Sequence, residues 1–251
     1  MHTADSDQPE GIFLRADWPA PPQVQTLIST RRGGVSPPPY HSLNIGAHVG
    51  DLAQHVAQNR AIIRAALPVA PAYLNQAHGN TVVRAAPALG SSPPDADASV
   101  DGSGQAACVV MTADCLPVLL CDRAGTVVAA AHAGWRGLAG GILQNTLAAM
   151  NVPPQEIMAY LGPAIGPDAF EVGPDVKEAF PMPRAGTAFT PIGGGKYLAD
   201  IYALARLVLG QAGVRAVYGG TRCTVLERET FFSYRRDGRT GRMASIIWLE
   251  R

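Results

Sequence analysis

Short apolar runs separated by turn residues constrain the fold of this chain more than any other feature of its sequence. The runs at residues 106–111, 117–121 and 127–131 are each too short for a typical helix. Apolar runs of this length, bounded by turn residues, are typical of strands buried on both faces. Because 27 glycines and 21 prolines interrupt the 251 residues, we expect short elements throughout.

Longer periodic segments predict helices at residues 52–67, 141–150, 175–180 and 200–212, and further strands at 24–30, 214–218, 223–226 and 243–249. Helices and strands alternate irregularly and without an internal repeat, which indicates an α+β protein. We expect mixed β-sheets covered by helices, layered as an α/β/β/α sandwich. Residues 12–251 are expected to form a single catalytic domain after a flexible N-terminus of residues 1–11.

The charge balance argues against two classes of partner. Twenty basic and twenty acidic residues give a formal net charge of zero, so no global field draws the chain to nucleic acid or to an anionic membrane. The first residues lack the basic start and apolar run of a secretory signal. The four cysteines form neither a CxxC pair nor a disulfide framework. We therefore expect a cytoplasmic protein with no nucleic-acid or membrane partner.

Three distant side chains lie at the ends of predicted strands, beside turns. His78 is at the rim of a predicted hairpin, in which Gly79-Asn80 joins strands at 72–76 and 81–84. Cys115 lies between two apolar runs, and His132 precedes a glycine-rich turn. Two imidazoles and one thiolate match a catalytic zinc site with an open fourth position. The alternatives are a core cysteine, a turn histidine and a helix-capping histidine.

These residues fall within an ordered series of blocks that resembles the bacterial family once labelled laccase-domain or multicopper polyphenol oxidoreductases. Members are also assigned as purine nucleoside phosphorylases and peptidoglycan editing factors. The resemblance implies that His78, Cys115 and His132 are the metal ligands. The sequence departs from the family pattern at residues 99–101. The blocks are STRRGGVS (29–36), SLN (42–44), HVGD (48–51), NR (59–60), NQAHG (75–79), DADA (95–98), TADCLP (112–117), HAGWRG (132–137), GPAIG (162–166), EVG (171–173), FSYRRD (232–237) and GR (241–242).

The activity implied by the resemblance is phosphorolysis of adenosine, inosine and methylthioadenosine, together with deamination of adenosine. The partners would be small-molecule nucleosides and phosphate, and the protein a monomer or a small homo-oligomer. Zinc suits the deamination because a bound divalent ion activates water. Phosphorolysis instead requires a site that holds phosphate and stabilises the positive charge that develops on the ribose. Cys115 and Asp114 are the candidate catalytic residues, with Asp114 either shuttling a proton or only stabilising a turn.

Four residues are candidates for substrate contacts. Arg136, at the glycine-rich turn, can hold phosphate with the help of the following helix N-terminus, and Arg60 is a second candidate. Asn44 and His48 can reach ribose hydroxyls or base edges, although capping or turn roles explain them equally well. A cluster of arginines lines either the entrance to the site or a charged hairpin turning at Asp237-Gly238, namely Arg235, Arg236, Arg239 and Arg242.

Three other functions use the same residues. Cys115 activated by a histidine would make a cysteine hydrolase or amidase. Copper can bind two histidines and a cysteine, but multicopper oxidation needs further histidines and the chain has six in all. Finally, the metal would only stabilise the fold if the chain has an editing role in cell-wall precursor metabolism.

Overall fold

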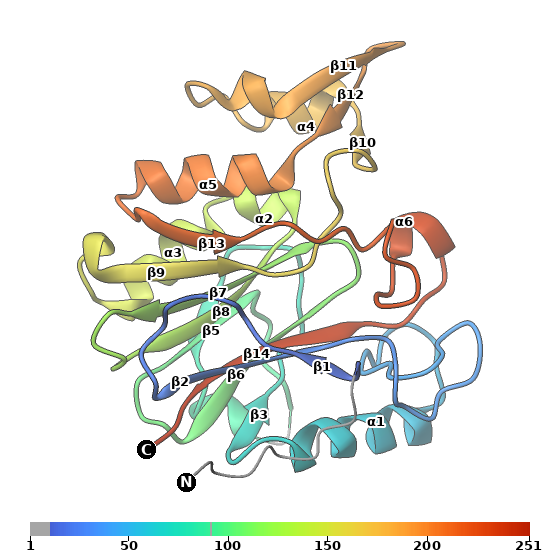
Figure 1. The fold of residues 1–251 in the computed structure, drawn as a ribbon, viewed down its shortest axis with the longest axis vertical. Helices are drawn as coiled ribbons and strands as arrows, with labels where there is room; N and C mark the ends of the chain where they lie inside the picture. Colours follow the sequence, from blue (N-terminus) through green and yellow to red (C-terminus); the bar gives the residue numbers. More distant parts are fainter. Residues whose placement is uncertain (1–10, 91) are drawn as a thin grey trace, which may run out of the picture.

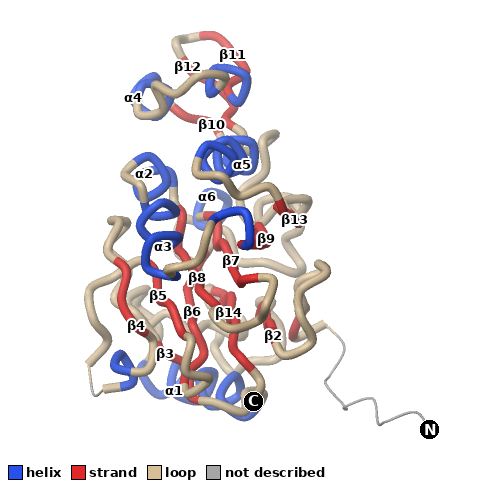
Figure 2. The backbone as a smooth tube through the Cα atoms, turned by 90° about the vertical axis from the view of Figure 1, so that its left-hand side faces the viewer, coloured by secondary structure: helices blue, strands red, loops and turns tan. Residues whose placement is uncertain are grey.

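Two mixed sheets pack face to face in the computed structural model, which describes residues 11–90 and 92–251 (Figures 1 and 2). Both contain antiparallel and parallel pairs. The first sheet has the order β1 (Phe13–Leu14), β2 (Val24–Ser29), β14 (Met243–Leu249), β6 (Ala106–Thr112) and β3 (Ala70–Ala72). The second has the order β13 (Ala216–Gly219), β9 (Ile157–Leu161), β7 (Leu116–Asp122), β8 (Val128–Ala133), β5 (Ala98–Asp101) and β4 (Val82–Arg84).

The central strands are apolar at nearly every position because both of their faces are covered. In β7, Leu119 and Cys121 point to the core between the sheets, whereas Leu116, Val118 and Leu120 point to the helices. Successive side chains of a strand alternate between its two faces, so a continuous apolar run fills both cores. The sequence-based reading of these runs as buried strands is confirmed.

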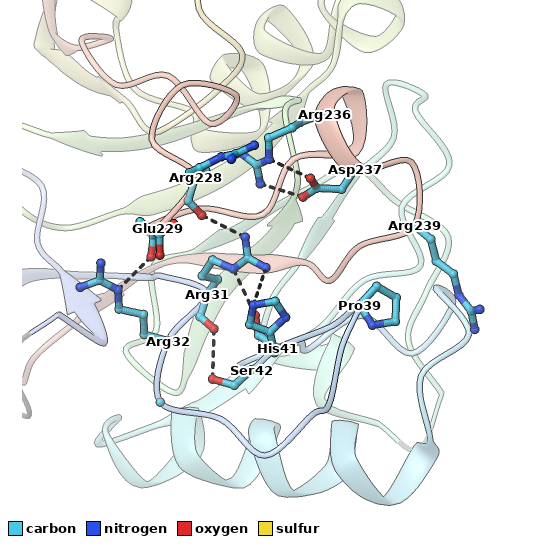
Figure 3. Close-up of a pocket in the computed structure, with 11 residues that line it drawn as sticks. Arg31, Arg32, Pro39, His41, Ser42, Arg228, Glu229, Arg236, Asp237 and Arg239 are labelled. Atoms are coloured by element: carbon cyan, nitrogen blue, oxygen red, sulfur yellow. Dashed lines mark hydrogen bonds and ion pairs between the residues drawn. The ribbon is translucent and has the colours of Figure 1, made fainter.

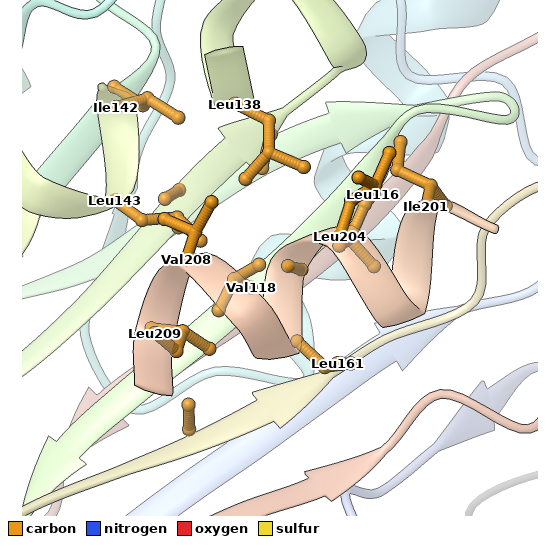
Figure 4. Close-up of a cluster of buried hydrophobic side chains, with 14 of the residues drawn as sticks. Leu116, Val118, Leu138, Ile142, Leu143, Leu161, Ile201, Leu204, Val208 and Leu209 are labelled. Carbon is orange, nitrogen blue, oxygen red and sulfur yellow. The ribbon is translucent and has the colours of Figure 1, made fainter. Parts of the chain in front are cut away.

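Helices cover the outer faces of both sheets. The first sheet is covered by α1 (Ala53–Ala65), whose Ile63 is fully buried. The second sheet packs on α2 (Trp135–Ala139), α3 (Ile142–Met150) and α5 (Ile201–Gln211), where Leu204 and Val208 meet Val118 and Leu161 (Figure 4). The Asp200 carboxylate caps α5 by accepting from Ala203 N. The expected mixed sheets in an α/β/β/α arrangement are thereby confirmed.

A third, small sheet projects beyond α5 (Figure 1). It has the order β10 (Glu171–Val172), β12 (Lys196–Ala199) and β11 (Phe189–Gly193), and it lies beside α4 (Pro174–Glu178). The short α6 (Tyr234–Asp237) lies on the same side as β10, where the Arg235 guanidinium donates to Glu171 O at 2.8 Å. Three 3₁₀ turns lie at Pro87–Leu89, Pro154–Glu156 and Ala185–Ala188.

Three local predictions are wrong. The segments flanking Gly79-Asn80 do not form a hairpin, because β3 pairs with β6 in one sheet and β4 pairs with β5 in the other. Residues 223–226 form a turn with one isolated bridge from Cys223 to Ala164 rather than a strand. Asp237 ends α6 instead of forming a hairpin turn. The expected flexible segment lies outside the described residues, except for Gly11.

No helix within residues 11–90 and 92–251 is long and apolar enough to cross a membrane.

Candidate metal centre

Strand pairing places Cys115 and His132 at the same end of the second sheet. Cys115 directly precedes β7, and His132 is the penultimate residue of β8. The two strands are antiparallel with Pro117 opposite His132, so the start of one lies beside the end of the other. His78 comes from the segment that crosses from β3 in the first sheet to β4 in the second. The connection of residues 113–115 makes the same crossing between β6 and β7, so both crossings meet at this end.

The three candidate ligands converge on one point. One donor atom from each of His78, Cys115 and His132 lies within 4.8 Å of the other two. The histidine rings meet edge to face, with centroids 4.8 Å apart. Zinc bonds of about 2.0–2.3 Å place its ligands up to about 4 Å apart, so small side-chain rotations close this set around one ion. The donors fit a metal with three protein ligands and one open position.

Asp97 orients two of the candidate ligands. Its Oδ1 lies 2.8 Å from His132 Nδ1 in the buried interior and also accepts from the His78 backbone N–H at 2.9 Å. Its Oδ2 accepts from Gly79 N at 2.7 Å. Because a carboxylate only accepts hydrogen bonds, Nδ1 of His132 carries a proton, which leaves Nε2 as the ring nitrogen that would bind a metal. Despite burial, the bond from His132 and the two backbone N–H groups hold the pKa of Asp97 below its usual value.

The surroundings of Cys115 favour its thiolate. Burial alone would raise the pKa of the thiol, but the charges and hydrogen bonds of His132 and His78 outweigh burial and lower it to about 6. By contrast, burial raises the pKa of both Cys108 and Cys121 to about 12. Metal ligation and nucleophilic attack both require the thiolate. Cys115 is therefore activated, unlike Cys108 and Cys121.

Gly134 allows the close approach of the candidate ligands. A Cβ atom at this position would lie 2.9 Å from the Sγ of Cys115 and 3.6 Å from a ring carbon of His78. A contact of 2.9 Å is shorter than real side chains tolerate, so a larger residue would displace the sulfur. The glycine of the HAGW block therefore serves the centre itself.

Two cavities meet at the centre, and both are lined by His78, Ala113, Cys115 and Tyr234. The first, of about 320 Å³, has largely apolar and aromatic walls, which also include Asp114, Gly134, Trp135, Arg136, Ile165, Phe170, Ile201 and Arg235. The second, of about 330 Å³, is more polar and also includes His48, Gln76, Met111, Thr112, His132 and Arg242. We call them the base cavity and the polar cavity.

Two of the predicted substrate residues line these cavities and two do not. Arg136 lines the base cavity and stacks over Trp135, with its guanidinium carbon 4.3 Å from the ring centroid. His48 lines the polar cavity. Asn44 is fully buried, and its amide bonds Gly46, Asp51 and Arg242 N.

Arg60 lies behind the wall of the polar cavity. It donates to Ile45 O at 3.0 Å, and its guanidinium carbon lies 4.2 Å from the centre of the Tyr73 ring. The charge of Arg60 still acts inside the cavity. The pKa of His48 is lowered by burial first, then by the charge of Arg242, and then by the charge of Arg60. The polar cavity is therefore electropositive.

Asp114 lines the base cavity but also anchors it. Its Oδ1 accepts from the Thr224 hydroxyl and its Oδ2 from Arg235 N, each at 2.6 Å. The residue adopts a left-handed φ of 97°, which is unusual for a side chain other than glycine. The carboxylate thus fixes α6 against the start of β7.

Besides Asp97, sequence reasoning missed two residues and left the position of a third open. Gln76 pairs its amide with Met111 N and O at 2.7 and 2.8 Å, which ties the His78 segment to β6. Tyr234 stands between the two cavities. Arg242, placed only in an arginine cluster, lines the polar cavity. The one available signal was the position of all three inside the shared blocks, next to the candidate ligands in the case of Gln76.

The layered fold and the His–Cys–His centre place this chain in a class of two-sheet sandwich proteins with a candidate metal site at one end of the sandwich. The chain belongs to the family described as multi-copper polyphenol oxidoreductase laccase, whose profile matches residues 25–250. It is 56% identical over 236 residues to the purine nucleoside phosphorylase YfiH of Escherichia coli strain K12, covering 92% of this chain and 96% of that protein.

Solved structures share the fold. A Neisseria meningitidis protein of domain family DUF152 has a TM-score of 0.94 and 68% identity, covering 96% of this chain and all of the other. YlmD of Geobacillus stearothermophilus has a TM-score of 0.90 at 30% identity, covering 97% and 98%. The family resemblance predicted from the sequence blocks is confirmed.

Proposed function

We propose that this chain is a zinc-dependent purine nucleoside phosphorylase that cleaves adenosine, inosine and methylthioadenosine with phosphate and also deaminates adenosine. The observation that carries the proposal is the position of the His–Cys–His centre between a base cavity with aromatic walls and an electropositive polar cavity. The two substrates differ in the same way, because a nucleoside carries a planar aromatic base and phosphate is an anion. The names of the bacterial relatives support the phosphorylase activity.

The base cavity suits a purine. Trp135, Phe170 and Tyr234 offer faces on which a planar base can stack, and Ile165 and Ile201 complete the apolar walls. Arg136 and Asp114 supply a donor and an acceptor for the polar edge of the base. We assign to Asp114 the uptake and return of the proton during deamination.

The polar cavity suits phosphate and ribose. Arg242 donates to Thr240 O and Gly241 O, which leaves other guanidinium N–H groups for an anion. The positive charge of Arg60 strengthens the field there, and His48 offers a ring nitrogen for hydrogen bonding. In phosphorolysis these groups hold phosphate beside the ribose carbon from which the base departs. Tyr234, shared by both cavities, positions the sugar between them.

When bound, the metal would supply a Lewis acid that polarises an oxygen atom of substrate or water. Its holders would be His78, Cys115 and His132, with Asp97 fixing the tautomer of His132. Zinc is the preferred ion because three protein ligands and an open position are typical of its catalytic sites. Copper accepts the same donors, and metal analysis of the purified protein separates the two.

The proposed enzyme has small molecules as its partners and works as a monomer or a small homo-oligomer in the cytoplasm. All four cysteines are free thiols, which suits a reducing compartment.

The test combines metal content with product analysis. Protein purified without added metal is analysed for zinc and copper, then incubated with each nucleoside with and without phosphate. We expect one zinc per chain and release of free base that depends on phosphate. His78→Ala and Cys115→Ala should lose metal and activity, whereas Cys121→Ala, which removes a core thiol, should keep both. Metal-loaded wild type that releases no base would contradict the proposal and favour a role in which the metal only stabilises the fold.

A second candidate function is a cysteine hydrolase or amidase, and the lowered pKa of Cys115 between two imidazoles favours it. A chelator separates the two functions, because a cysteine nucleophile works without metal. Activity that survives complete metal removal but is lost on alkylation of Cys115 would support the hydrolase.

A further inference from the structure

A third cavity, of about 540 Å³, lies apart from the metal centre and shares no lining residue with the base or polar cavity (Figure 3). We call it the arginine cavity. Its walls come from the STRRGG block, the following loop, the residues before Thr230 and the end of α6. Five arginines line it together with His41, two carboxylates and three smaller residues, namely Arg31, Arg32, Arg228, Arg236, Arg239, Glu229, Asp237, Gly33, Pro39 and Ser42.

The cavity concentrates positive charge on a chain whose formal net charge is zero. Five guanidinium groups face two carboxylates, an excess of three positive charges. One of the carboxylates is already engaged, because Asp237 forms a two-point pair with Arg236 at 2.8 and 2.7 Å. The excess therefore rests on the other arginines, against the single carboxylate of Glu229.

Arg31 is held in place by the protein backbone. It donates to His41 O at 3.1 Å and to Arg228 O at 2.9 Å, and its guanidinium carbon lies 4.9 Å from the centre of the Phe232 ring. These contacts fix the direction of a half-buried guanidinium before any ligand arrives. Such preorganisation reduces the entropy cost of binding.

Arg228 is the least engaged of the group. Within residues 11–90 and 92–251 its guanidinium has no hydrogen-bond acceptor, and its side chain runs towards Arg236 (Figure 3). Arg31 is repelled by both of these arginines: burial first, then the charge of Arg236 and more weakly that of Arg228, lower its pKa, while Asp237 and Glu229 partly offset this by raising it. An anion among the three would relieve this repulsion.

We propose that the arginine cavity is an anion-binding site, separate from the metal centre, that binds a phosphate group. Guanidinium groups bind phosphate oxygens through paired N–H donors, which explains why arginines rather than lysines line the walls. The cavity volume falls within the range of small-molecule sites, so the phosphate belongs either to a sugar-phosphate-sized ester or to the free ion.

Isothermal titration of the full-length chain tests the proposal, with inorganic phosphate and ribose 5-phosphate as separate ligands at constant ionic strength. Arg228→Gln removes one charge but no side-chain hydrogen bond to residues 11–90 and 92–251. It should weaken binding of the occupant at least about tenfold, the effect of losing one charge-assisted hydrogen bond. Arg84→Gln, on an exposed residue of β4, is the matched control and should bind as wild type does.

The outcomes separate this site from the proposed active site. Arg242→Gln tests phosphate binding in the polar cavity, so a loss confined to Arg228→Gln supports the arginine cavity even if the proposed function fails. The ligand that loses more affinity identifies ester or free ion as the source. Titrations of both ligands that are identical for wild type and a folded Arg228→Gln variant would overturn the proposal.

Discussion

Asp97 and His132 form a buried carboxylate–imidazole pair, with Oδ1 and Nδ1 2.8 Å apart. In Asp97→Asn an amide N–H replaces an acceptor that also serves the backbone of His78. We expect metal affinity to fall about 10- to 100-fold, as for other outer-shell partners of metal-binding histidines. Competition with a chromogenic chelator measures the change.

The control for this variant is Asp122→Asn. Asp122 is also buried and also accepts two backbone N–H bonds, from Thr126 and Val127, but at the opposite end of β7. Both variants should lose about 1–3 kcal/mol of unfolding free energy, and only Asp97→Asn should lose metal. Equal metal affinity in the two would refute the role given to Asp97.

Gly134→Ala is expected to damage the centre through one methyl group. The new Cβ would lie 2.9 Å from Cys115 Sγ, so the sulfur must move away from the histidines. We expect metal content well below one ion per chain and a matching loss of activity. Gly210→Ala in α5 meets no atom within 4 Å and should keep the metal while stabilising the helix by about 0.5–1 kcal/mol.

The two cavities should respond differently to substitution. Arg242→Gln removes the charge in the polar cavity and should raise the KM for phosphate about 10- to 100-fold, with a smaller effect on the nucleoside. Trp135→Leu removes a stacking surface in the base cavity and should mainly raise the KM for the nucleoside. Steady-state kinetics with each substrate varied in turn measures both. If Arg242→Gln instead raised mainly the KM for the nucleoside and Trp135→Leu that for phosphate, the nucleoside would bind in the polar cavity and phosphate in the base cavity.

Acid should weaken the loop beside the polar cavity through Asp51. Burial would raise its pKa, but hydrogen bonds from Asn44, Ser36 and Leu52 N outweigh burial and lower it below 3.8. The stabilisation is therefore complete above the unfolded pKa and is lost as the pH falls through the lower, folded pKa. Urea unfolding between pH 7 and pH 3 should show a shallower acid loss for Asp51→Asn than for the exposed Asp168→Asn.

Much of the fold follows from local pattern. The runs that became β6, β7 and β8 are apolar on both faces, and the stripe of α5 has helical spacing, so both were predictable. Sequence pattern also located the candidate ligands, because the shared blocks mark them. Convergence of those ligands depends on the register of β7 against β8, which no local signal specifies.

The errors share a physical cause. The chain does bend at His78 and Gly79, but turn chemistry does not determine whether the flanking strands pair with each other or with distant partners. Asn44 reads as a ligand contact or a turn residue, and only the fold shows its amide bonding three segments. The strands β11 and β12 were missed although Gly193 at the end of β11, together with Gly194 and Gly195 between the strands, gave a turn signal.

The pairing of Pro117 with His132 makes the centre sensitive to strand alignment. A slip of one residue along β8 would rotate the imidazole away from Cys115 and towards α3 and α5. A chain that folds with shifted strands is then unable to retain the ion. Metal stoichiometry in a preparation accordingly counts the correctly aligned molecules, and chelator-resistant metal serves as an assay of folding quality.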